Sequence, residues 1–347
     1  MNPASSLRFK GAPGSPYTRK MLAYLRYRRL PYEFLITDQA DREGLPEPKV
    51  ALLPTFYLPG KDGTVEAVVD STPLIRRFEG EYAGRATLPP HPAVAFLNDL
   101  VEDYADEWLT KPMFHYRWYY DADIEQAGTV LPHWRAIQAD RETLAALKAQ
   151  FSKRQIDRLY VVGSNDITAP VIEASYQRLL ALLDGLIEAQ KFVFGGRPAS
   201  ADFALYAQLT QLARFDPTPA ALCLREAPRV FAWTDLVDDL SGHPAEENAW
   251  ADLATVETRL KPLLTEIGRT YAPVLLANAA ALQGGAAELE TTIDGQRWVQ
   301  PPFPYQGRCL QTLRARYGQL AGDDRAAVDD MLAGTGCEAL FPRSAAS

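Results

Sequence analysis

Alternating strand patterns are confined to the first 84 residues of this chain, and this limits the folds that it can adopt. "LRF" at 7–9 is a short strand candidate, residues 15–27 have a helical pattern, and "YEFLI" at 32–36 alternates as a strand does. After a loop-rich segment with a short helix candidate, "LPTFYL" and "TVEAVV" predict two strands joined by the turn "PGKDG". A helix start at Asp70 follows. The order β-α-β then β-β-α predicts a small α/β domain.

The rest of the chain is predicted to be helical. "RATLPPHP" at 85–92 has the composition of a linker, and periodic helical stretches follow it. These stretches cover about 93–120, 131–160, 168–190, 200–213 and 225–241. Residues 245–347 add more helices around one extended interruption, "TTIDGQRWVQPPFPY". Because 347 residues are expected to form two or three domains, we predict domains at 1–84, 93–244 and 245–347.

The composition is that of an ordinary globular protein, with 47% hydrophobic and 23% charged residues. A net charge of −8 and the lack of a dense Lys/Arg stretch argue against nucleic-acid binding. No apolar run approaches the roughly 18 residues of a membrane span, so no membrane partner is expected. Cys223, Cys309 and Cys337 fit neither a disulfide framework nor a zinc site. These features favour a cytoplasmic protein without a metal.

The stretch "GAPGSPYTRK" at 11–20 places Ser15 at the mouth of the first helix. Gly11 and Gly14 permit unusual backbone angles, and the prolines stiffen the turn before the helix. Two interpretations of Ser15 remain open. It caps the helix, as serine often does, or its hydroxyl and the free N–H groups of the helix start bind an anion.

Two other stretches carry similar polar groups. In "LLPTF" at 52–56, Pro54 opens a strand, and a cis Leu53–Pro54 bond would leave the Leu53 backbone groups available to an extended peptide. In "VDST" at 69–72, Asp70 and Ser71 open a helix with a carboxylate and a hydroxyl. Such groups accept from an ammonium and donate to a carboxylate, but they also serve as simple helix caps.

Together, these ordered signatures and the helical second domain resemble the glutathione transferase superfamily. "FVFGGRPASADFALYAQL" at 192–209 looks like the segment that starts the core helix of that family's second domain. The resemblance covers about residues 7–240. It implies an α/β thioredoxin-like domain followed by an all-α helical domain, and here the latter continues into a helical C-terminal extension.

The resemblance also implies roles for individual residues. Ser15 matches the serine whose hydroxyl binds the glutathione sulfur in serine-type classes. Leu53 matches the residue whose backbone pairs with the cysteinyl part of glutathione, and Pro54 matches the family's cis-proline. Asp70 and Ser71 match the pair that holds the γ-glutamyl end. Glutathione would then be a co-substrate, and no metal is implied.

Several residues depart from the family pattern or compete for these roles. Thr18 matches the second position of the thioredoxin-type motif and offers no thiol, so disulfide exchange is disfavoured. Tyr17 is a rival hydroxyl donor, although its place inside the helix favours a packing role. Ala199 stands where a Ser/Thr cap precedes Asp202, unless Ser200 substitutes. No basic residue at a familiar spacing matches the anchor of the glycyl carboxylate; Arg42 and Lys49 lie in the appropriate loop.

The segment "NDLVEDYADEWLTKPMFHYRWYY" combines aromatic and charged side chains at helical spacing. Its one charged face, which we expect to form ion pairs and packing contacts rather than a metal site, consists of Asp103, Glu107, Lys111 and His115. Its aromatic residues are candidates for lining the pocket of a second substrate, as the resemblance implies for this helix: Tyr104, Trp108, Phe114 and Trp118. Cys309, further along, is expected to be buried.

Two functions follow from these observations. The first is a glutathione transferase-like enzyme that activates the glutathione thiol for attack on a small-molecule electrophile, with a homodimer as the implied assembly. The second is a non-catalytic binding or scaffolding protein that kept the two-domain fold and uses its C-terminal extension as a partner surface. The matched Ser15 and Asp70–Ser71 favour the first. The unmatched glycyl anchor and the roughly hundred extra residues at 245–347 favour the second.

Overall fold

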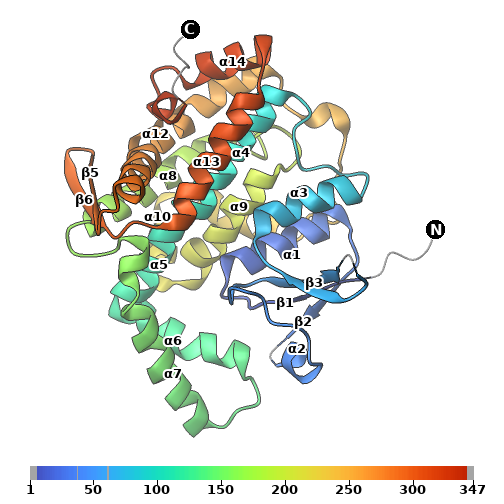
Figure 1. Ribbon diagram of the computed structural model, residues 1–347, viewed down its shortest axis with the longest axis vertical. Coiled ribbons are helices and arrows are strands. Elements are labelled where there is room, and N and C mark those ends of the chain that lie inside the picture. Colours follow the sequence, from blue (N-terminus) through green and yellow to red (C-terminus); the bar gives the residue numbers. More distant parts are fainter. Residues whose placement is uncertain (1–5, 37, 61, 342–347) are drawn as a thin grey trace.

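The first part of the chain forms a four-stranded sheet with strand order β2-β1-β3-β4. Its strands are β1 (Leu7–Lys10), β2 (Tyr32–Leu35), β3 (Thr55–Pro59) and β4 (Val65–Val68). β1 is parallel to β2 and antiparallel to β3, which pairs antiparallel with β4. Helices α1 (Pro16–Arg28) and α3 (Ser71–Glu81) lie between this sheet and the helical part, while the short α2 (Gln39–Arg42) lies on the opposite side (Figure 1). The predicted thioredoxin-like α/β domain is confirmed.

The sheet packs through aromatic side chains that its register places side by side. Phe9 of β1 is fully buried and pairs with Phe34 of β2 and Phe56 of β3. The Phe9 ring stacks on both, with centroid distances of 5.1 Å and 4.7 Å. Such stacking adds to the burial free energy of each ring, and it fixes the positions of the loops that follow β1 and precede β3.

A computed structural model describes residues 6–36, 38–60 and 62–341. The ends of the first and third predicted domains, 1–5 and 342–347, lie outside the described residues. No helix within the described ranges is long and apolar enough to span a membrane.

Helices make up the middle of the chain, as predicted. They are α4 (Pro92–Glu107), α5 (Thr110–Tyr119), α6 (Asp121–Arg135), α7 (Arg141–Ile156), α8 (Ala169–Ala189), α9 (Ser200–Leu209), α10 (Pro217–Glu226) and α11 (Pro228–Val237), with short helical segments at Leu159–Val162, Thr210–Phe215 and Glu247–Ala249. The predicted 93–120 helix is divided at Trp108, and the predicted 131–160 helix is interrupted before α7, whose cap Asp140 accepts from the Thr143 N–H at 2.8 Å. α6 and α7 form an arm that projects from the molecule (Figure 1).

α9 is the central helix of the molecule. All ten of its residues are buried, and it packs between α1 and α4. A helix that is buried on every side belongs to a core, which agrees with the segment singled out in the sequence. Asp202 accepts from the backbone N–H groups of Ala199 (2.8 Å) and Val193 (2.9 Å), so half of the capping box is present. Ser200 does not supply the other half, because its hydroxyl binds Glu102 on α4.

The C-terminal extension is largely helical and also contains a β-hairpin. It comprises α12 (Leu253–Gly284), β5 (Leu289–Ile293), β6 (Gln296–Gln300), α13 (Pro304–Gln319), α14 (Gly322–Leu332) and a short helix at Cys337–Leu340. The hairpin turns at Asp294 and Gly295, both with positive φ, within the stretch expected only to be extended. Asp-Gly between alternating residues is typical of a hairpin turn, so the sequence itself indicates the hairpin.

The extension packs against α4, on the side away from the arm (Figure 1). α13 and α14 both contact α4, and α12 contacts both α4 and α8. Trp298 of β6 is fully buried, and its ring lies 5.3 Å from that of Trp108. The extension is therefore integrated into the core rather than loosely attached to it.

Candidate functional site

Ser15 ends the loop after β1 and is the N-cap residue of α1. Its backbone is extended, and its hydroxyl oxygen accepts from the Thr18 N–H at 3.3 Å, so the capping role is present. The same oxygen lies 3.4 Å from the Leu53 carbonyl oxygen, to which it donates. Since hydroxyl hydrogen bonds are usually about 2.7–2.8 Å long, this second bond is weak. The hydroxyl proton is therefore free to move to a better acceptor.

Leu53 and Pro54 lie beside Ser15, and the peptide bond between them is cis. Pro54 is buried, whereas Leu53 is half-buried. The Leu53 N–H has no backbone partner within the described part of the chain. β3 begins directly afterwards at Thr55, whose hydroxyl donates to the Leu52 carbonyl at 2.8 Å. A backbone donor thus remains for an extended ligand next to the Ser15 hydroxyl.

Asp70 occupies the N-cap position of α3 but does not cap the helix with its side chain. Its φ of 82° is a conformation that residues other than glycine rarely adopt, and such strain is found preferentially at functional sites. Its Oδ2 accepts a 2.7 Å hydrogen bond from the Tyr305 hydroxyl on α13. Ser71, the first residue of α3, is buried. The simple capping interpretation of Asp70 is wrong.

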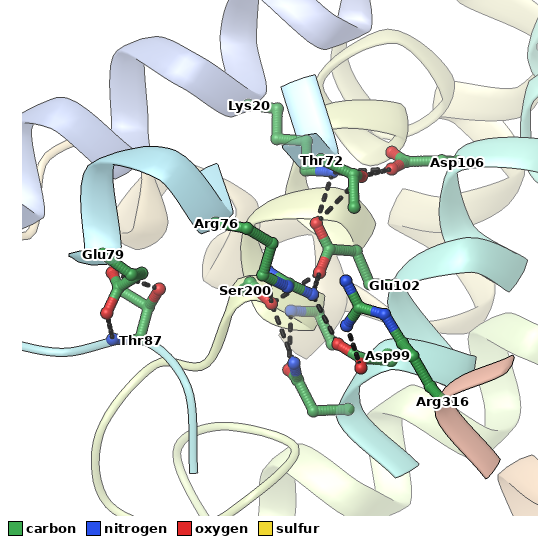
Figure 2. Close-up of polar contacts among 12 residues, drawn as sticks. Lys20, Thr72, Arg76, Glu79, Thr87, Asp99, Glu102, Asp106, Ser200 and Arg316 are labelled. Atoms are coloured by element: carbon green, nitrogen blue, oxygen red, sulfur yellow. Dashed lines mark hydrogen bonds and ion pairs between the residues drawn. The ribbon is translucent and has the colours of Figure 1, made fainter. Parts of the chain in front are cut away.

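A buried ionic network joins α1, α3, α4 and α9 (Figure 2). Lys20 Nζ lies 2.8 Å from Glu102 Oε1 and 2.6 Å from Asp106 Oδ2. Arg76 Nη2 binds Glu102 Oε2 at 2.5 Å. Burial alone would raise the pKa of Glu102, but the charges of Arg76 and Lys20 hold it well below its usual range. The carboxylate is therefore charged, and it fixes α3 against α4.

The same network extends to the C-terminal extension. Asp99 of α4 binds Arg76 of α3 at 2.5 Å and also forms an ion pair with Arg316 of α13. Figure 2 shows the two guanidinium groups approaching Asp99 from different helices. One carboxylate thus connects the thioredoxin-like domain, the helical domain and the extension.

The charged face predicted on α4 and α5 is buried and used in separate polar contacts. Lys111 Nζ donates to Gln300 Oε1 at 2.9 Å, and His115 Nδ1 lies 2.8 Å from Ser164 Oγ. Burial raises the pKa of Asp103 to about 7 and that of Glu107 to about 8, and it lowers the pKa of Lys111 to about 7. Within the described ranges, no three His, Cys, Asp or Glu side chains are arranged to hold a metal ion.

The predicted pocket aromatics mostly belong to the core. Tyr104, Trp108 and Trp118 are at most 1% exposed, so they present no surface to a substrate. Phe114 is the half-buried member of the set. The Tyr17 hydroxyl donates to the Asp106 carbonyl at 2.8 Å, which fits the packing role expected for it.

Two side chains that the sequence did not single out hold the loop before Ser15. Arg117 of α5 donates to the Gly14 carbonyl at 3.0 Å, and Gln211 donates to the Pro13 carbonyl at 3.2 Å. Both are buried, and both come from the helical domain. A polar residue at a buried position of a helix indicates that it binds another segment of the chain. The sequence does not identify that segment.

Cys309 and the two candidate glycyl anchors, Arg42 and Lys49, differ in burial. Cys309 is buried, as expected, and burial raises the pKa of its thiol. Arg42 forms a surface ion pair with Asp38 at 3.0 Å, and Lys49 is exposed. Of the predicted site residues, the structure places Ser15 beside Leu53 and joins Asp70 to Tyr305 of the extension.

Residues 10–86 match the family model of the glutathione S-transferase N-terminal domain. No curated protein matches the chain. Among solved structures, it is similar to a glutathione S-transferase from Methylobacterium radiotolerans in complex with glutathione sulfonate, at 18% identity and a TM-score of 0.38; 72% of this chain and 97% of that one are covered. Glutathione transferase E6 from Drosophila melanogaster has 18% identity, coverage of 68% and 88%, and a TM-score of 0.40.

A Tau class enzyme from mango, Mangifera indica, is similar at 16% identity, with a TM-score of 0.39 and coverage of 73% and 96%. The fold and the family match define a thioredoxin-like domain of the glutathione S-transferase type, joined to a helical domain. The family match concerns this N-terminal domain, residues 10–86. The serine-type subclass remains a prediction.

Proposed function

We propose that the protein is a glutathione transferase in which Ser15 stabilises the glutathione thiolate. The observation that supports this most directly is the position of the Ser15 hydroxyl at the start of α1, next to the Leu53 backbone and bound to it only at 3.4 Å. A bound thiolate would be a stronger acceptor than that carbonyl, because hydrogen bonds to charged groups are stronger than those to neutral ones. The proton of the hydroxyl would then point at the sulfur.

The chemistry requires a lower thiol pKa. A free thiol with a pKa near 8.5 is only a few per cent ionised at pH 7, and the thiolate is the nucleophile. A hydroxyl donor and the positive end of α1 both favour the charged form, at about 1.4 kcal/mol per pKa unit. The resulting thiolate would attack a small electrophile whose identity the sequence does not specify.

The other matched residues would hold the tripeptide. The Leu53 N–H, which has no backbone partner in the described part of the chain, is suited to pair with the cysteinyl backbone. Asp70 is suited to bind the γ-glutamyl ammonium, since its side chain is not used as a cap. Ser71 lies directly beside it at the start of α3.

Calorimetric titration of glutathione, with thiolate absorbance followed in parallel, tests this proposal. We expect wild type to bind with micromolar to millimolar affinity and to show the thiolate signal at neutral pH. Ser15→Gly should still bind but lose that signal; glycine is chosen because it replaces an N-cap serine at a cost of only a few tenths of a kcal/mol. Ser71→Ala should weaken binding. Absence of any glutathione binding by wild type would refute the proposal.

A matched control separates the catalytic role of Ser15 from its capping role. Asp252 caps α12 by accepting from the Thr255 N–H at 2.8 Å, away from the Ser15 loop. Asp252→Gly should therefore lower stability by a similarly small amount, a few tenths of a kcal/mol, without changing the thiolate signal. If it abolished the signal as Ser15→Gly does, the effect would be one of folding.

The alternative, a non-catalytic binding or scaffolding protein, is favoured by one contact. Tyr305 of the extension already occupies an oxygen of Asp70, which glutathione is expected to need. In this case wild type would bind glutathione weakly or not at all, and no electrophile would be conjugated. Turnover with any electrophile in a substrate screen excludes it.

The proposal includes an oligomeric state and a cellular compartment. The resemblance implies a homodimer, and the face of α4 on which α13 and α14 pack is already covered within one chain. A dimer would therefore form through another surface, and sedimentation equilibrium measures the mass that decides this. The three buried free cysteines suit a reducing compartment, so we expect the protein in the cytoplasm.

A further inference from the structure

A polar cavity lies between α13, the start of α3 and α4. It has a volume of about 260 Å³, and its lining combines acidic and basic side chains. The lining includes Asp70, Asp103, Asp106, Glu107, Tyr305 and Arg308. Pockets for whole small ligands are typically about 300–1,000 Å³. This cavity therefore suits one end of a tripeptide rather than all of it.

Arg308 contributes a cation that no protein carboxylate neutralises within the ranges that the structure describes. The other two arginines at the cavity, Arg76 and Arg316, are both ion-paired with Asp99. Arg308 is exposed, and its guanidinium carbon lies 5.2 Å from the centre of the Tyr305 ring. The fork of N–H donors on a guanidinium matches the two oxygens of a carboxylate. Arg308 is thus positioned for an anionic group at the mouth of the cavity.

Asp106, in contrast, offers a hydrogen-bond acceptor to a ligand. Its Oδ2 receives hydrogen bonds from Lys20 (2.6 Å) and Thr72 (3.1 Å), whereas its Oδ1 is buried without a donor among the described residues. The residue is 7% exposed. A buried acceptor without a donor is costly, so an N–H donor of a ligand would be stabilised there. Figure 2 shows the carboxylate of Asp106 next to Thr72 at the start of α3.

Tyr305 connects these two sides of the cavity. Its hydroxyl donates to Oδ2 of Asp70 at 2.7 Å, while its ring lies under the Arg308 guanidinium. Burial and the neighbouring Asp70 charge raise the pKa of Tyr305, so the hydroxyl keeps its proton and remains a donor. One side chain of the extension therefore positions both an acid and a base of the cavity.

We propose that α13 completes the amino-acid end of the glutathione site. Arg308 receives the α-carboxylate of the γ-glutamyl residue, while Asp70, positioned by Tyr305, receives its α-ammonium together with Asp106. This inference rests on the proposed glutathione function. Only the γ-glutamyl end of the tripeptide carries both charges; the glycyl end carries a carboxylate alone. A cavity with an unpaired cation, Arg308, and an acceptor without a donor among the described residues, Asp106 Oδ1, matches the first of these ends.

The test compares glutathione with its decarboxylated analogue, γ-aminobutyryl-cysteinylglycine, by calorimetry on the full chain. Arg308→Gln should weaken glutathione binding about tenfold, since a hydrogen-bonded ion pair is lost. It should leave the affinity for the decarboxylated analogue unchanged, because that ligand has no α-carboxylate. Arg297→Gln removes the same charge from the exposed hairpin, where Arg297 pairs with Glu290 at 2.9 Å, and should change neither affinity.

Tyr305 is tested as a positioning residue with the deaminated analogue, glutaryl-cysteinylglycine. Tyr305→Phe should weaken glutathione binding about threefold to tenfold and leave the affinity for the deaminated analogue unchanged, since that ligand lacks the ammonium. Tyr119→Phe is the matched control, because Tyr119 also donates to an aspartate, Asp166, at 2.8 Å on another part of the surface. A merely structural role would reduce both affinities equally.

The outcomes separate this inference from the proposed function. If wild type binds glutathione and Arg308→Gln binds it equally well, the role of α13 is refuted while the glutathione site stands. An equal loss for glutathione and the decarboxylated analogue also refutes it. If wild type binds no glutathione, both proposals are wrong.

Discussion

Arg117 of α5 donates a hydrogen bond to the backbone carbonyl of Gly14, 3.0 Å away, and thereby ties the helical domain to the residue that precedes Ser15. The same guanidinium forms a two-pronged ion pair with Asp216, through Nε and Nη2 at 2.9 Å. Both side chains are almost fully buried. The loop that carries the candidate nucleophile-activating hydroxyl is thus held by an interaction made outside its own domain.

Arg117→Met should destabilise the protein by about 3–5 kcal/mol, because it leaves Asp216 buried without its partner. The double variant Arg117→Met/Asp216→Leu should regain much of this loss, since a buried ion pair replaced by apolar side chains is often tolerated. Urea unfolding of the three proteins measures the effect. A double variant as unstable as the single one would show that the ion pair itself, not the uncompensated charge, stabilises the fold.

The local parts of the candidate site could be predicted from the sequence, whereas the long-range parts could not. Ser15, Pro54 and Asp70 are marked by turn residues and helix starts within a few positions of each. Tyr305 donates to Asp70, which lies 235 residues earlier in the sequence, and Arg117 donates to Gly14, which lies 103 residues earlier. A single sequence contains no spacing signal for contacts of that length, because periodicity reports only local structure.

The buried aromatic residues illustrate the same limit. The resemblance made Tyr104 and Trp108 candidates for a face that lines the pocket of a second substrate. The extension covers that face instead: Trp298 packs on Trp108, and the Tyr271 ring lies 6.1 Å from that of Tyr104. An amphipathic pattern indicates that a face is covered but not by what.

A second prediction concerns the docking of the extension. A Cβ on Gly268 of α12 would lie 2.1 Å from the Thr335 carbonyl oxygen and 2.7 Å from the Cys337 nitrogen, both of them backbone atoms. Gly268→Ala should therefore cost about 1–3 kcal/mol or more. Thermal and urea unfolding measure this loss.

Gly318 supplies the control for that substitution. It lies in α13, and a Cβ there would meet no atom within 4 Å. Gly318→Ala should stabilise the protein by about 0.5–1 kcal/mol, because alanine is favoured over glycine inside a helix. Equal effects of the two substitutions would contradict the close approach of α12 to the residues around Thr335.

The third prediction is a pH dependence of stability. Burial, with the nearby charges of Asp103 and Asp106, raises the pKa of Glu107 to about 8, whereas an unfolded glutamate has a pKa near 4.3. The folded state keeps a proton that the unfolded state releases as pH rises between these values. Stability should therefore fall from pH 5 to pH 7, by at most about 1.4 kcal/mol per pH unit from this group.

Urea unfolding at pH 5, 6 and 7 measures this slope. Glu107→Gln should make it shallower, since a glutamine exchanges no proton. Glu107→Asp retains the carboxyl group and should retain the slope. Burial raises the pKa of Asp103 to about 7, so this carboxyl group also makes stability fall as pH rises. Lys111, whose pKa burial lowers to about 7, changes the stability only above pH 7. A slope that Glu107→Gln leaves unchanged would disprove the role of Glu107.

The contact between Asp70 and Tyr305 also has a consequence for synthesis of the chain. At about 5–20 residues per second, the ribosome adds Tyr305 roughly 10–50 s after Asp70, whereas helices and hairpins form within microseconds. Until then, neither Asp70 nor Asp99 of α4 has its partner on α13. Charged side chains on an exposed surface oppose association with other chains. We expect the acidic groups that α13 later covers to oppose association of unfinished chains in this way.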